Sequence, residues 1–157
     1  IGDYNALWLY YSAAYYAFIM EKYELALEML NKVMSYKKVE MKKEMQAAAR
    51  LLNLLTHLEL GNDEMLEHIT LSAQRYLKSR DFYFEFERLF LRYFGKLAKH
   101  YNDNDRQPLY REMKTSLESL IADNPGEKDG MVDFNFQAWI TAKTSGKPLK
   151  EIYTSIK

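Results

Sequence analysis

Residues 40–60, EMKKEMQAAARLLNLLTHLEL, place apolar side chains on two sides of one helix. One stripe at helical spacing is formed by Met41, Met45, Ala48, Leu52 and Leu55. A second stripe is formed by Ala47, Leu51, Leu54 and Leu58. A helix that is apolar on two sides has to be covered on two sides, so this stretch predicts a helix held between neighbours on both faces.

Helical patterns and their stop signals recur along the rest of the chain. Further helices are expected at about residues 3–20, 23–36, 62–78, 81–101, 108–123, 133–144 and 148–157, with Asp3 as the cap of the first. Residues 125–130, PGEKDG, predict a loop. The tight turns begin at positions 21, 61, 102 and 146, so they lie 40, 41 and 44 residues apart. A nearly constant period with two helices in each period is typical of an α-solenoid.

The predicted fold class is therefore all-α, with seven or eight helices in one domain spanning residues 1–157. The antiparallel helix pairs cover about residues 3–36, 40–79, 81–123 and 131–157. Pairs must stack because one pair alone cannot bury both of its apolar faces. The chain starts at Ile1 and enters a helix almost at once, so we expect it to be a fragment of a longer protein.

The composition argues against several classes of function. Lys and Arg together number 22, as do Asp and Glu, so net charge gives no reason to expect nucleic acid or an acidic membrane as partner. The absence of Cys excludes disulfides, thiolate zinc sites and cysteine nucleophiles. Residues 4–20 carry no charge, but they include five Tyr and are shorter than the roughly 20 apolar residues of a membrane span. We expect no membrane association and a cytoplasmic location.

No motif for catalysis or metal binding is present. The chain has no Gly-x-Ser-x-Gly elbow, no phosphate-binding glycine loop and no His-Glu-x-x-His. Two histidines and three glutamates flank Gly61: His57, Glu59, Glu64, Glu67 and His68. Their spacing lacks the Glu-x-x-His pairs of a di-iron site and favours an acidic turn at the start of a helix. We therefore expect no enzymatic activity, no cofactor and no metal.

Residues 75–99 concentrate positive charge. Seven basic residues, Arg75, Lys78, Arg80, Arg88, Arg92, Lys96 and Lys99, stand against Asp81, Glu85 and Glu87. Four of the basic residues recur at helical spacing within residues 81–101. This pattern is typical either of a solvated helix face or of a strip that attracts an anion. With a net charge of zero, an acidic peptide is a better candidate for that anion than DNA.

The first helix pair resembles a tetratricopeptide repeat. The residues that carry the resemblance are Tyr10, Ala13, Ala14 and Ala17 before the turn, and Tyr23, Ala26 and Leu30 after it. The second pair keeps Gly61 and Ala73 but has Leu66 where the family has a small residue, and the later pairs match in helix spacing alone. The overall composition of the chain also resembles that of degenerate helical-repeat tails of large bacterial proteins. The resemblance implies a short right-handed superhelix.

In this family the first helix of each pair lines a concave groove that binds a partner segment. Carried onto this chain, the resemblance implies a groove with Trp8, Tyr11 and Tyr15 as anchors at one end. Its other end would be basic, with Arg92, Lys96 and Lys99 as steering charges. Tyr11 and Tyr15 occupy the places of the family's Lys and Asn clamp for chaperone tails, so that specificity is not expected.

These observations predict a non-enzymatic scaffold for protein–protein interaction that binds a protein or peptide, with an acidic one among the candidates, in a helical-repeat groove. Two alternatives stay open. The chain could instead be the packing tail of a larger multidomain protein, with the rest of its own chain as partner, or a homodimer module. The third interpretation, ranked lowest, is nucleic-acid binding through the basic face of residues 81–101.

Overall fold

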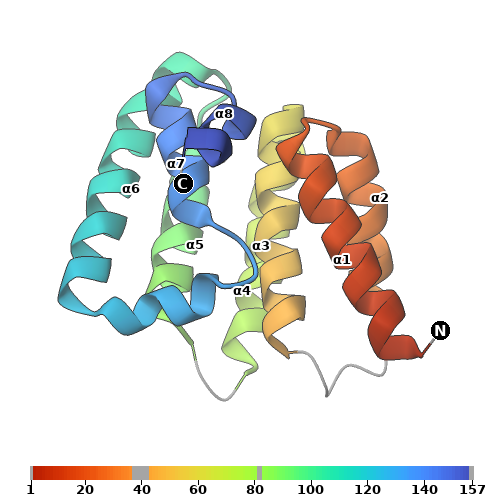
Figure 1. Ribbon diagram of the computed structural model, residues 1–157. Helices are drawn as coiled ribbons and strands as arrows, with labels where there is room; N and C mark the ends of the chain where they lie inside the picture. The colour runs from red at the N-terminus through yellow and green to blue at the C-terminus, as the bar shows by residue number, and fades with distance from the viewer. Residues whose placement is uncertain (1, 37–42, 81–82, 156–157) are drawn as a thin grey trace.

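The structure is a computed structural model that describes residues 2–36, 43–80 and 83–155. Every regular element in these residues is a helix, which confirms the all-α class (Figure 1). The α-helices are α1 (Asp3–Ile19), α2 (Tyr23–Met34), α3 (Lys43–Leu60), α4 (Asp63–Lys78), α5 (Glu85–Leu97), α6 (Asp103–Asp123), α7 (Phe136–Ser145) and α8 (Leu149–Ser155), and η2 (Pro125–Met131) is a 3₁₀ helix. Met41, Asp81 and Ile156, which belong to predicted helices, lie outside the described residues.

The four predicted turns are found where the sequence placed them. The backbone has a positive φ at Glu21, Gly61 and Gly146, at the turns that follow α1, α3 and α7. The turn between α5 and α6 ends at Asn102, whose side chain accepts a hydrogen bond from the Asp105 amide at 2.8 Å. A left-handed residue ends a helix by directing the chain back along it, so these positions produce antiparallel pairs.

Several predicted helix ends were wrong because local capping decided them. α6 begins at Asp103, five positions before Pro108, since Asn102 caps it. α5 begins at Glu85 because the Glu87 carboxylate accepts the Phe84 amide and starts the helix there. Asp3 lies inside α1, and Gly2 takes the cap position. Residues 125–130, expected as a loop, form part of η2.

α3 is buried on two sides, as its two apolar stripes predict. It packs against α2 and α4 along its length and also contacts α1. Its buried residues run almost without interruption from Met45 to Leu58. α3 is therefore the central helix of the first two pairs, and the pairs α1/α2 and α3/α4 are held together through it.

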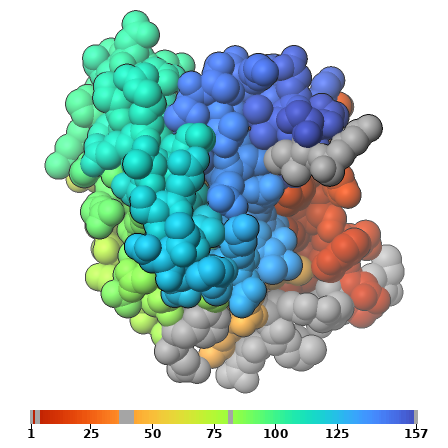
Figure 2. Space-filling view, turned by 60° about the vertical axis from the view of Figure 1, so that its left-hand side comes forward, coloured from red at the N-terminus to blue at the C-terminus, as the bar shows by residue number. Residues whose placement is uncertain are grey.

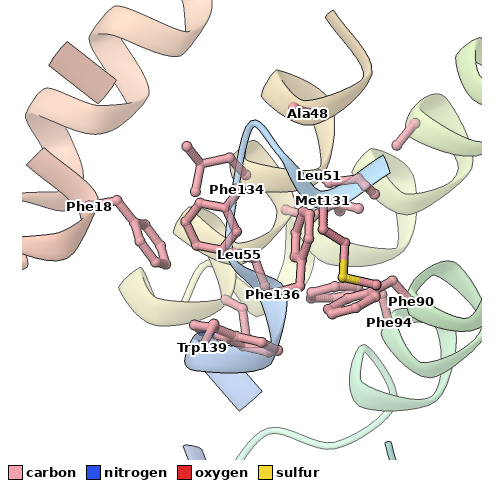
Figure 3. Packing of buried hydrophobic residues seen from close by; sticks show 14 of the residues in the cluster. Phe18, Ala48, Leu51, Leu55, Phe90, Phe94, Met131, Phe134, Phe136 and Trp139 are labelled. Atoms are coloured by element: carbon pink, nitrogen blue, oxygen red, sulfur yellow. The ribbon is translucent and has the colours of Figure 1, made fainter. Parts of the chain in front are cut away.

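The fourth pair packs on the third, because α7 lies against α6. Residues 131–145, here called the inner segment, also lie across α1, α3 and α5 (Figure 3). Phe134 packs against Phe18 of α1 with ring centroids 5.7 Å apart, and Phe136 packs against Phe90 of α5 at 4.7 Å. In a solenoid each repeat touches only its neighbours, so these added contacts with the first pair depart from an open solenoid.

The aromatic residues of the inner segment pack it into the core. Phe134, Phe136 and Trp139 are all fully buried, and each contacts rings from other helices. Figure 2 shows the C-terminal residues, in blue, between α6 and the red α1 on this face of the molecule. The burial of each large ring stabilises the fold by about 1.5–3 kcal/mol, which makes this segment part of the main core.

Candidate interaction cleft between α4 and α5

The two tyrosines predicted to anchor a partner contact the protein's own chain. Tyr11 is buried, and its hydroxyl donates to the Asp133 carbonyl at 2.7 Å. Burial raises the pKa of Tyr11, so the hydroxyl stays protonated and keeps this donor role. Tyr15 is hydrogen-bonded to the Tyr153 hydroxyl and packs edge-on to Phe134 at 5.2 Å. The inner segment thus takes the face that the family resemblance assigns to a partner.

The remaining predicted residues lie apart from these tyrosines. Trp8 is exposed on α1, and Arg92, Lys96 and Lys99 are exposed on or just after α5. Figure 1 shows α3 between α1 and α5, so the aromatic residues of α1 and the basic residues of α5 lie on separated helices. Lys96 is turned toward α6, where its amine lies 3.8 Å from a carboxylate oxygen of Glu112.

A cleft of about 890 Å³ lies between α4 and α5 and contains one of the predicted residues, Arg92. α4 contributes one wall through Thr70, Leu71, Gln74 and Lys78. α5 contributes the other through Arg88, Leu91, Arg92 and Gly95, and Arg80 and Tyr83 lie at the end where the two helices connect. The α5 residues follow the i, i+3, i+4, i+7 spacing of a single helix face.

This cleft opens away from the inner segment. At about 100° per residue, the face of α5 centred on Arg88, Leu91 and Gly95 lies roughly opposite the face that carries Phe90 and Phe94. The latter two rings pack against the inner segment, Phe90 on Phe136 and Phe94 on Trp139. α5 therefore has one face in the core and the other on a wall of the cleft.

The cleft is positively charged. Lys78, Arg80, Arg88 and Arg92 line it, and no carboxylate is among its described lining residues. Two of these four positive charges are paired with a nearby carboxylate. Arg80 forms a buried ion pair with Glu87, and Arg88 lies 3.6 Å from the exposed Glu85. Lys78 and Arg92 are therefore the charges that an anion in the cleft would meet first.

The buried pair of Arg80 and Glu87 holds the connected end of the cleft in place. Both side chains are almost fully buried, and the Glu87 carboxylate also accepts the Phe84 amide at 3.0 Å. Burial raises the pKa of Glu87, and the nearby Arg80 guanidinium opposes that rise. Because its charge is matched inside the protein, Arg80 positions the chain between α4 and α5 and contributes little to the charge facing outward.

Glu127 fixes the start of α5 from the other side. It is buried in η2, and its carboxylate oxygens accept the amides of Glu85 at 3.3 Å and Phe86 at 2.9 Å. A carboxylate is favourable there because the first amides of a helix carry partial positive charge and lack partners within the helix. The α5 wall of the cleft is thus anchored to the core by two hydrogen bonds, which join residues 42 and 41 positions apart in the chain.

Sequence reasoning located part of this cleft and missed its other wall. Arg92, Lys78 and Arg88 all belong to the basic run of residues 75–99. Leu71 and Gln74 belong to no motif. The one signal in the sequence was Leu71, an apolar residue on the otherwise polar side of α4, and the structure shows it exposed. Lys96 and Lys99, by contrast, do not line the cleft.

A second, smaller hollow of about 310 Å³ lies near the turns of the first, third and fourth pairs, and two of its charged residues are paired with each other. Lys143 lies 3.1 Å from a Glu59 oxygen, and the Trp139 indole donates to Glu59 at 3.1 Å. Within the part of the chain that the structure describes, no group of acidic or histidine side chains is arranged to hold a metal ion. None of the described helices is both long and apolar enough to cross a bilayer.

Comparisons with known proteins add no functional assignment to this geometry. Neither a protein-family model, nor a curated protein, nor a solved structure gave a significant match to this chain.

Proposed function

We propose that the protein is a non-enzymatic interaction scaffold that binds an acidic segment of a partner protein in the cleft between α4 and α5. In this proposal α1 to α6 are three tetratricopeptide-like pairs whose concave side is filled by the inner segment. The partner then binds on the opposite side of α5. The observation that carries the proposal is the cleft itself, which is open, basic and free of carboxylates among its described lining residues.

The chemistry of the cleft suits a peptide that is both acidic and apolar. Leu71 is 47% exposed at its wall, and Leu91 and Tyr83 add apolar surface within it. An apolar side chain buried between these residues would supply affinity, while Lys78 and Arg92 would attract carboxylates and orient the segment. The zero net charge of the chain and the small number of unmatched cations favour this occupant over nucleic acid.

A titration followed by amide NMR tests the proposal on a chain of this size. The probe is a 12-residue peptide alternating Glu with Leu and Phe, and a 12-nucleotide oligo-dT is titrated in parallel. We expect the peptide to shift amides of residues 70–78 and 88–95, with an affinity that falls as salt is raised. Shifts scattered over the surface, or none at millimolar peptide, would refute the assignment.

Charge-reversal variants separate the cleft from the rest of the basic run. Lys78→Glu with Arg92→Glu should weaken peptide binding by at least tenfold. Lys99→Glu is the matched control, because it reverses a charge near the same helix outside the cleft, and it should change affinity by less than twofold. If oligo-dT binds more tightly than the peptide and loses binding with the same variants, the basic face is a nucleic-acid site and the peptide assignment is wrong.

A further inference from the structure

The exposed side of α1 carries an apolar stripe that contains two small polar residues, Asn5 and Ser12. Four large side chains are about half exposed or more on this helix: Trp8 at 54%, Leu9 at 49%, Tyr16 at 68% and Met20 at 53%. At about 100° per residue they fall, with Asn5, Ser12 and Ala13, in one sector of roughly 140°. They make up four of the nine exposed large apolar residues among those described, which marks this stripe as the main apolar surface.

The other sides of α1 are already covered. α2 and α3 pack against it, and the inner segment contacts it through Tyr11 and Phe18. The stripe is therefore what is left of a helix that is apolar all the way round, and such a helix is normally buried. From the exposed fractions of its side chains, the stripe offers roughly 500 Å² of apolar surface, at the upper end of what monomers expose.

We infer that this stripe binds the same stripe of a second copy, so that the protein forms a two-fold symmetric dimer through α1. The charge pattern supports a second copy as the occupant. Residues 4–20 contain no charged side chain, so two copies meet without like-charge repulsion and without a buried unpaired charge. A partner with a charged face would find nothing to pair with here.

The order of side chains along α1 also fits an antiparallel pair of identical helices. The small residues Ser12 and Ala13 stand at the middle of the stripe, with Trp8 and Leu9 before them and Tyr16 and Met20 after them. With the two-fold axis near Ser12 and Ala13, Trp8 of one copy faces Tyr16 of the other, and the reverse contact is made at the same time. The small residues let the helices approach closely, and the rings on either side fill the space.

The available area predicts a dimer of moderate affinity. A standard protein–protein interface buries about 800 Å² on each partner, and the stripe supplies more than half of that. We expect a dissociation constant on the order of micromolar, in the range of transient or modest homodimers. This inference does not depend on the α4/α5 cleft, because the stripe and the cleft lie on different helices.

Sedimentation equilibrium of the purified protein and of two charged variants tests the dimer. Ala13→Arg and Ala13→Glu each place a charge against its own copy at the proposed axis. Each should raise the dissociation constant by roughly a hundredfold, since like charges across an interface cost several kcal/mol. Ala13 is exposed, so thermal melts of both variants should match that of the parent protein. Met65→Arg, at an exposed apolar position on α4, is the control and should leave the dimer intact.

An equimolar mixture of the two Ala13 variants distinguishes self-association through this axis from any other arrangement. Opposite charges then face each other, and we expect the mixture to recover a heterodimer that neither variant forms alone. Tyr16→Glu, on the same stripe, gives a second test should an Ala13 variant fold poorly. The inference is overturned if the parent protein is monomeric up to about 200 µM. It is also overturned if the dimer survives the charged variants, or if the mixture does not recover it.

Discussion

Replacing Gly130 by Ala tests the packing of η2 and the inner segment on α5. Gly130 has an ordinary negative φ, so the effect of a side chain there is steric. A Cβ at this position would lie 2.5 Å from Cε1 of Phe86 and 2.7 Å from Cδ2 of Phe84. Ordinary contact needs 3.4 Å or more, so the rings or the backbone of η2 would have to move by about 1 Å.

The rings have little room for this movement. Phe86 is 1% exposed and lies between Phe90 and Phe136, with ring centroids 6.3 and 5.6 Å away. Overpacking of this kind costs about 1–3 kcal/mol, and the smaller backbone entropy of Ala in the unfolded chain returns about 0.5–1 kcal/mol. We expect Gly130→Ala to lower the free energy of unfolding by about 1–2 kcal/mol.

Urea unfolding followed by far-UV circular dichroism measures this change, and Gly95→Ala is the matched control. Gly95 lies inside α5, and a Cβ there meets no atom within 4 Å, so Ala should raise stability by about 0.5 kcal/mol through helix propensity. The same substitution is thus predicted to have opposite signs at two positions. A Gly130→Ala variant as stable as the parent protein would show that η2 does not pack against Phe84 and Phe86. If the packing is correct, Phe84→Leu in the Gly130→Ala background should recover part of the loss.

Three further predictions concern the anchor of α5, the turn after α3 and the cleft. Glu127→Ala should lower stability by about 2 kcal/mol in urea unfolding, because it leaves the Glu85 and Phe86 amides without their acceptor. The control is Glu118→Ala on the surface, which should change stability by under about 0.5 kcal/mol. Burial lowers the pKa of His57, whose Nδ1 lies 3.0 Å from the side-chain nitrogen Nδ2 of Asn62, so the unfolded chain takes up the proton more readily. The free energy of unfolding should therefore fall as pH drops below 6.5, toward the lower pKa of His57 in the folded protein. The His57→Gln variant should lose this dependence between pH 7.5 and 5.5. If the variant keeps the pH profile of the parent protein, the neutral state of His57 is contradicted. Gly95→Gln should keep or raise stability while weakening peptide binding in the cleft at least tenfold, and unchanged affinity in the NMR titration would place the partner elsewhere.

Much of the fold was predictable because it depends on neighbours in the sequence. Positive-φ positions such as Gly61 and Gly146 and the periodicity of apolar residues act over a few residues, and they placed every turn within a pair. The two stripes of α3 likewise predicted a helix covered on both sides. The errors at the starts of α5 and α6 came from caps at Phe84 and Asn102, whose effect is local but competes with equally plausible signals, such as Pro108.

The candidate site was predictable in part. The basic run of residues 75–99 pointed to α5, and Arg92 lies in the cleft. The hydrogen bonds of Tyr11 with Asp133 and of Tyr15 with Tyr153 could not be predicted, since they join residues more than 120 positions apart. Aromatic residues have the same spacing on a helix whether they face a partner or the protein's own core, so periodicity cannot separate the two.

By itself, the sequence determined the helical class, the turns, the absence of charge in residues 4–20 and the clustering of cations in residues 75–99. Each of these depends on residue type and on spacing over one or two helical turns. Only the tertiary structure decided that Phe134, Phe136 and Trp139 fill the side expected to be a groove, and that the open surfaces are the α4/α5 cleft and the outer stripe of α1. The physical reason is that hydrophobic burial is non-directional, and an aromatic segment therefore packs into whichever apolar face the chain can reach.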